Sequence, residues 1–85
     1  MHTVRLESRY GAADGLTPSI AAKIAECASK YKAHLSIVIG GRATQIESLI
    51  SVLSMDLRRG LPLTIVAEGA DAEDAAEDMR RLIEG

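Results

Sequence analysis

Glycines divide this 85-residue chain into short segments, and their positions limit its possible folds more than any other feature. Because glycine has no Cβ, it favours tight turns and helix ends. A chain of this length forms one domain, so we expect residues 1–85 to build a single unit of short elements. The glycines that separate these elements are Gly11, Gly15, Gly40, Gly41, Gly60 and Gly69.

Strand patterns occur in the first part of the chain, in its middle and after residue 60. In the first of them, Val4, Leu6 and Ser8 alternate with polar residues and share one side. The pair Gly40-Gly41 is a tight-turn signal, which predicts a hairpin around it. We expect strands at residues 3–8, 34–39, 42–46 and 61–67.

Amphipathic helices are predicted between these strands and after the last one. The first begins at Thr17-Pro18, a good N-cap followed by a proline suited to the first turn, and runs to about Tyr31. The last opens at Asp71 and is expected to turn its alanines, Met79, Leu82 and Ile83 inward. Both lengths are typical of helices in small domains.

A middle helix follows from an apolar stripe with helical spacing. Arg58 and Arg59 are expected in its last turn and Gly60 at its end. Its start is ambiguous, because Thr44 with Glu47 could form a capping box and Ser48 could cap a shorter helix. The stripe consists of Ile46, Leu49, Ile50, Leu53 and Leu57.

The resulting element order is β-α-β-β-α-β-α, which is typical of an α+β fold. One possibility is a ferredoxin-like split βαβ arrangement with a trailing helix. The other is an open-faced β-sandwich, a four-stranded antiparallel sheet covered on one face by three helices. Periodicity alone does not separate the two.

Composition argues against several classes of function. The formal net charge is −2 and only 2% of residues are aromatic, so neither a basic field nor stacking platforms for nucleic acid are expected. No apolar run approaches the roughly 20 residues of a membrane span, so no membrane insertion is expected. The single cysteine, Cys27, excludes an intramolecular disulfide and favours a cytoplasmic setting, with the thiol buried and inert.

Residues for catalysis are scarce. His2, in a frayed terminus, and His34 have no partner at metal-ligand spacing, so no metal and no cofactor are expected. The acidic residues near the C-terminus are interpreted as the first turn and solvated face of the last helix rather than as catalytic groups. They are Asp71, Glu73, Asp74, Glu77 and Asp78.

Two places remain as candidate sites. The loop of residues 11–17 leads to a helix N-terminus, where Gly15, Thr17 and Ser19 could bind an anion; the alternative is that Thr17 only caps the helix. Around Ser48, the side chains of Leu49, Ile50 and Leu53 could form an exposed contact patch; the alternative is that all three belong to the core.

Several of these motifs together resemble HPr, the small phosphocarrier family of the bacterial phosphoenolpyruvate-dependent sugar phosphotransferase system. The resemblance covers essentially the whole chain, and it implies the open-faced sandwich rather than the ferredoxin-like fold. The motifs that carry it are Asp14-Gly15-Leu16-Thr17, Ala21-Ala22, Gly41-Arg42, Glu47-Ser48-Leu49 and Ala67-Glu68-Gly69.

The resemblance also implies a lost activity. Family members that carry phosphate use a His, followed two residues later by an Arg and then a Pro. Here Thr17 occupies the position of the His, Ser19 that of the Arg and Ile20 that of the Pro. The chain is therefore expected to be degenerate as a phosphocarrier and not to act as an enzyme.

Ser48 matches the serine that an ATP-dependent kinase phosphorylates in some relatives. The pattern is similar to that of the catabolite-repression HPr paralogue, which lacks the active His and keeps this serine. The resemblance implies a regulatory protein whose partners are an HPr kinase, a transcriptional regulator or enzymes of the phosphotransferase system. Alternatives are phosphotransfer through another residue at the anion site, and a ferredoxin-like interaction module outside the system. The oligomeric state is left open.

Overall fold

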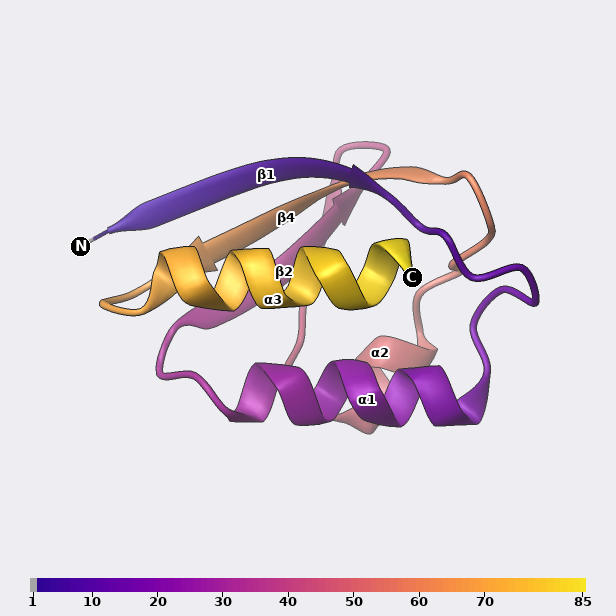
Figure 1. The fold of residues 1–85 in the computed structure, drawn as a ribbon, viewed down its shortest axis with the longest axis horizontal. Helices are drawn as coiled ribbons and strands as arrows, with labels where there is room; N and C mark the ends of the chain where they lie inside the picture. The colour runs from indigo at the N-terminus through magenta and orange to yellow at the C-terminus, as the bar shows by residue number, and fades with distance from the viewer. Residues whose placement is uncertain (1) are drawn as a thin grey trace.

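The elements follow the order expected from the sequence in a computed structural model that describes residues 2–85 (Figure 1). Thr17 and Pro18 start the first helix as predicted, and every predicted strand is present with small shifts at its ends. The elements are β1 (Thr3–Arg9), α1 (Pro18–Ser29), β2 (His34–Ile39), β3 (Arg42–Gln45), α2 (Leu49–Leu53), β4 (Pro62–Glu68) and α3 (Ala72–Glu84).

The strands form one antiparallel sheet in the order β1-β4-β2-β3. β4 is central, and Ile65 lies opposite Leu6 of β1 on one side and Ile37 of β2 on the other. A ferredoxin-like sheet would pair its first and third strands in parallel, which this sheet does not do. The three helices lie on the same side of the sheet (Figure 1), so the open-faced β-sandwich is confirmed.

Aliphatic side chains fill the space between the sheet and the helices. The inward residues of β2 and β4, such as Ile37 and Ile65, are fully buried. α3 turns a row of alanines toward β1 and β4, and these small side chains allow the helix to pack close to the sheet. The buried face of α3 consists of Ala72, Ala75, Ala76, Met79 and Ile83. No helix within residues 2–85 is long and apolar enough to cross a membrane.

The first helix ends earlier than its apolar pattern predicts. α1 stops at Ser29, and Tyr31 lies in the loop that follows. The phenolic hydroxyl of Tyr31 donates a 2.6 Å hydrogen bond to a carboxylate oxygen of Asp78 on α3. Further along this loop, the backbone N–H groups of Lys32 and Ala33 donate to the Asp71 carboxylate. These bonds hold the loop against α3 and divert the chain from the helix axis.

The same bonds correct the interpretation of the acidic residues near the C-terminus. Asp71 stands at the N-cap position of α3, but its side chain makes no cap hydrogen bond there and binds the loop between α1 and β2 instead. Hydrogen bonds from Lys32 and Ala33 hold the pKa of Asp71 below its usual range. Asp78 is likewise a structural acceptor, so only part of the acidic set forms a solvated face.

The N-terminal histidine is also placed differently from the expectation of a frayed end. The backbone N–H of Gly69 donates to the carbonyl oxygen of His2, which extends the β1–β4 pairing. Its Nε2 lies 2.9 Å from a carboxylate oxygen of Glu73. Both side chains are largely exposed, so this contact contributes little to stability.

The middle helix differs most from its prediction. α2 spans only Leu49–Leu53, the start at Ser48 is right, and the alternative box at Thr44 is wrong. Arg58 and Arg59 are therefore not in its last turn. The inward face carries Val52, which is fully buried, followed by the buried Met55. Of the predicted stripe, Leu49, Ile50 and Leu53 instead lie on the outer face of α2, whereas Ile46 and Leu57, outside the helix, are buried in the core.

Cys27 is buried in the interface between α1 and α3, as expected for an inert thiol. Burial, together with the charge and hydrogen bond of the nearby Asp78, raises the pKa of this thiol to about 11. An unfolded chain would ionise the thiol near pH 8.5. The folded state therefore loses relative stability as the pH rises from that value toward 11, because only the unfolded chain releases the proton.

We predict that Cys27→Ala has a flatter dependence of stability on alkaline pH than the wild type. Between pH 8 and pH 11 the variant should lose about 1–2 kcal/mol less, because it lacks the titrating thiol. Urea unfolding at a series of pH values measures this slope. Parallel slopes for the two proteins would contradict the assignment of the raised pKa to burial of Cys27.

Candidate functional site

Tyr10 organises the loop that leads to α1. The residue is almost fully buried, and its backbone N–H donates to Leu61 while its carbonyl accepts from Gly60. Its phenolic hydroxyl donates a 2.9 Å hydrogen bond to the carbonyl oxygen of Gly15. Burial raises the pKa of Tyr10, which favours the protonated hydroxyl that donates this bond. One side chain thus connects the end of β1 to the turn before Thr17.

Two glycines allow this loop to approach other backbones closely. The N–H of Gly11 donates to the carbonyl of Ile83 near the end of α3, and a Cβ at Gly11 would overlap the carbonyl group of Glu84. Gly15 has a φ of +70°, and a Cβ there would lie 3.2 Å from the carbonyl oxygen of Leu57. The loop is therefore fixed between the end of α3 and the segment that follows α2.

Thr17 acts as the N-cap of α1. Its backbone is extended, with φ −101° and ψ 161°, and its Oγ1 accepts a 3.3 Å hydrogen bond from the N–H of Ile20. Pro18 has no N–H, so two of the first donors of the helix are absent or already used. The capping interpretation of Thr17 is confirmed by this bond. The turn that contains Gly15, Thr17 and Ser19 keeps few free amides for an anion.

Ser48 occupies the equivalent position at the start of α2 and is exposed. Its backbone is extended, with φ −157° and ψ 173°, and its Oγ accepts a 3.4 Å hydrogen bond from the N–H of Ser51. The Ser51 hydroxyl in turn accepts from the N–H of Ser48, which completes a capping box. The neighbouring Glu47 is also exposed and places a negative charge beside Ser48.

Three large apolar side chains are exposed next to Ser48. Leu49 is 43% exposed, Ile50 80% and Leu53 50%, whereas Val52 on the opposite side of the helix is fully buried. An Ile as exposed as Ile50 gains nothing for the fold by being apolar. The contact-patch alternative therefore agrees with the structure, and the core alternative is wrong for these three residues. We call this surface the α2 patch: Ser48, Leu49, Ile50 and Leu53.

The α2 patch and Thr17 belong to the same helical layer. α1 packs against α2, and Leu16 and Ile20 near the start of α1 pack partly buried against the core. The first turn of α1 carries no acidic residue, and Ser19 in that turn is neutral. The α2 patch is apolar, with the exposed Glu47 beside it, and such a surface suits contact with another protein.

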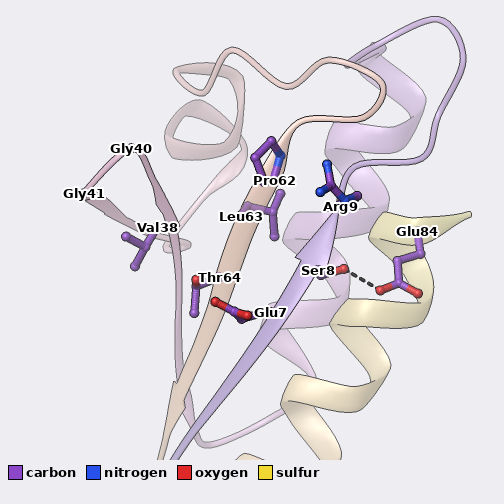
Figure 2. A pocket seen from close by; sticks show the side chains of 10 residues that line it. All are labelled: Glu7, Ser8, Arg9, Val38, Gly40, Gly41, Pro62, Leu63, Thr64 and Glu84. Carbon is purple, nitrogen blue, oxygen red and sulfur yellow. Dashed lines mark hydrogen bonds between the residues drawn. The ribbon is translucent and has the colours of Figure 1, made fainter.

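A separate hollow of about 630 Å³ lies at the end of the sheet near the β2–β3 hairpin (Figure 2). Glu7 and Arg9 of β1 and Thr64 of β4 line it, and it includes none of the residues that the sequence predicted for the two candidate sites. Ser8 and Glu84 also line it, and the Ser8 hydroxyl donates a 2.6 Å hydrogen bond to Glu84, drawn as a dashed line in Figure 2. The sequence contained a signal for that bond, because Ser8 is a polar residue on the inward side of a strand.

The remaining candidate residues do not gather into a reactive site. Within the described residues 2–85, no group of three His, Cys, Asp or Glu side chains is arranged to hold a metal ion. His34 is exposed at the start of β2 and lies opposite Glu68 of β4. The structure thus brings hydroxyls and apolar side chains to the helix starts, and no imidazole.

Comparison with known proteins agrees with this geometry. The family model described as the HPr component phosphorylation site of the phosphotransferase system matches residues 8–85. The chain belongs to the HPr family. It is 32% identical to the phosphocarrier protein HPr of Borreliella burgdorferi, over 95% of this chain and 94% of that protein.

Solved HPr structures have the same fold. The phosphocarrier protein HPr of Bacillus anthracis superposes with a TM-score of 0.88 at 26% identity, covering 95% of this chain and 96% of that one. The catabolite repression protein Crh of Bacillus subtilis superposes with a TM-score of 0.75 at 22% identity, covering 95% of this chain and 86% of that one. The second likeness shows the fold alone. Membership of the HPr family also rules out the ferredoxin-like module.

We predict that Thr17→Ala destabilises this HPr-family protein by about 1 kcal/mol, because the N–H of Ile20 loses its acceptor. Thr17→Ser keeps the hydroxyl and should retain most of the stability. Ser19→Ala is the matched control, since this exposed side chain makes no cap bond and should change stability by less than about 0.5 kcal/mol. Urea unfolding measures all three; equal losses for Thr17→Ala and Ser19→Ala would contradict the capping role.

Proposed function

We propose that this HPr-family protein has lost the histidine phosphocarrier step and acts as a regulatory protein through contacts around Ser48. The observation that carries the proposal is the α2 patch, in which an exposed serine adjoins three exposed apolar side chains. Absence of His at position 17 supports it. The protein acts in the bacterial cytoplasm, where the phosphotransferase system and ATP are available.

Loss of the phosphocarrier step follows from the chemistry of Thr17. A neutral imidazole nitrogen is nucleophilic and forms a phosphoramidate that passes its phosphoryl group on readily. The Thr17 hydroxyl is a weak nucleophile, and its oxygen already accepts the hydrogen bond of Ile20. A phosphothreonine ester would be a poor donor to the next protein. Ser19, in place of the Arg, supplies no positive charge to balance a phosphate.

Modification of Ser48 is the regulatory step of the proposal. The Ser48 Oγ attacks the γ-phosphorus of ATP, the bond from that phosphorus to the bridging oxygen of ADP breaks, and a base of the kinase takes the hydroxyl proton. The hydrogen bond from Ser51 uses a lone pair of Oγ and leaves this proton free. The phosphate adds about −1.5 to −2 charges beside Glu47.

The α2 patch gives the modified protein a surface that a partner can recognise. Leu49, Ile50 and Leu53 supply apolar area, and the phosphate on Ser48 supplies a charge that an Arg of the partner can bind. Candidate partners are a transcriptional regulator and enzymes of the phosphotransferase system. The charge added at Ser48 decides which of them binds, because it lies at the edge of the apolar area.

We predict that phosphoenolpyruvate and the first enzyme of the phosphotransferase system leave the protein unlabelled. An HPr that contains the active His serves as the positive control in the same reaction. Acid-labile phosphate on this protein, detected with labelled phosphoenolpyruvate, would contradict the loss of the phosphocarrier step and favour the alternative of phosphotransfer at the anion site.

The matching prediction for Ser48 uses an HPr kinase and labelled ATP. The wild type should acquire one acid-stable phosphate, and Ser48→Ala should acquire none, because the only proposed acceptor is removed. Ser54→Ala keeps Ser48 and is the control. Mass spectrometry counts the phosphates; undiminished labelling of Ser48→Ala would remove Ser48 from the proposed function.

A further inference from the structure

The hydroxyl of Ser51 is saturated with hydrogen bonds to the backbone around Ser48. Its Oγ accepts from the N–H of Glu47 and from the N–H of Ser48, each at 3.1 Å. The same oxygen donates a 2.7 Å hydrogen bond to the carbonyl of Ser48. The backbone N–H of Ser51 meanwhile binds the Ser48 Oγ. Four bonds thus join the two serines and Glu47.

These bonds act on a segment that has little other support. α2 has five residues, far fewer than the 12–15 that an isolated helix needs in water. The segment is anchored by the buried Ile46, whose N–H donates to Leu35, and by the fully buried Val52. Every residue from 47 to 50 between these anchors is exposed. The extended backbone of Ser48 therefore depends on the Ser51 hydroxyl.

We infer that Ser51 is a positioning residue that holds Ser48 for phosphorylation, an inference that rests on the proposed function. Its hydroxyl keeps Ser48 at φ −157° and ψ 173°, with the Ser48 Oγ exposed and acting only as an acceptor in its bond from the Ser51 N–H, so that its proton is free to leave. After the transfer, the N–H of Ser51 becomes a charge-assisted donor to the modified residue. The effect of Ser51 on phosphorylation is thus indirect, through the conformation of Ser48.

The test compares Ser51→Ala with Ser51→Thr, which restores a hydroxyl, and with Ser54→Ala. The last is a matched control, because the Ser54 hydroxyl donates to the carbonyl of Ser51 and does not contact Ser48. Steady-state phosphorylation by an HPr kinase with ATP gives kcat and KM. Ser51→Ala should lower kcat/KM about fivefold, mainly by raising KM, because fewer molecules present Ser48 in the bound geometry. Ser51→Thr and Ser54→Ala should stay within about twofold of the wild type.

A second measurement needs no kinase. Amide hydrogen exchange and the backbone coupling constant of Ser48, both from NMR, report directly on the held conformation. In Ser51→Ala the amides of Glu47 and Ser48 should exchange about fivefold faster than in the wild type, while that of the anchored Ile46 is unchanged.

The outcomes separate the inference from the proposed function. Equal kcat/KM for Ser51→Ala and the wild type, or an equal loss in Ser54→Ala, would overturn the positioning role. An unlabelled wild type would overturn the proposed function, and the exchange rates then decide the conformational part. If Ser51→Ala left the hydrogen exchange of the Glu47 and Ser48 amides unchanged, the claim that Ser51 holds the conformation of Ser48 would be wrong as well.

Discussion

The central position of β4 is the constraint on which the rest of the structure depends. This strand comes late in the chain, yet it lies between β1 and β2 and contributes the buried Leu63, Ile65 and Ala67. The pairing continues past the end of β1, where Tyr10 binds Leu61, and from there Tyr10 holds the carbonyl of Gly15. The turn before Thr17 is thus placed by a strand that begins 45 residues later. Within the sheet, β4 is the strand that joins β1 to the β2–β3 hairpin.

The two helix starts in that layer use the same local physics for different ends. In α1 and in α2, a hydroxyl of an extended N-cap residue accepts the N–H three residues further on. At Thr17 this bond satisfies the N–H of Ile20, in a first turn where Pro18 has no N–H to offer. The side chain at this position is a hydroxyl and not an imidazole. At Ser48 the cap is exposed among apolar side chains and is reinforced by the Ser51 hydroxyl. The two caps therefore share the bond to the third residue and differ in the reciprocal bond from Ser51 and in their surroundings.

Most of the fold could be predicted from the sequence, and the middle helix shows why the rest could not. Alternation in the strands identifies the buried side correctly, because one face of this sheet is covered and the other is not. In α2, helical spacing found the stripe of Leu49, Ile50 and Leu53 without revealing whether it faces the core. The helix is so short that Val52 is its only buried residue, and a single residue makes no recognisable pattern for the inward face. The resemblance to HPr pointed to Ser48, whereas the role of Ser51 and the bond between Ser8 and Glu84 were not foreseen.

The sequence by itself determined the element order, the aliphatic core and the hydroxyl side chain of Thr17 before the first helix. These follow from residue type and local spacing, which do not depend on how distant segments meet. Only the tertiary structure decided the strand order, the exposure of the α2 patch and the pairing of Tyr31 and Asp71 with distant partners. Each of these involves residues far apart in the chain, and their free energy comes from burial and hydrogen bonds that exist only once the sheet and the helices have packed.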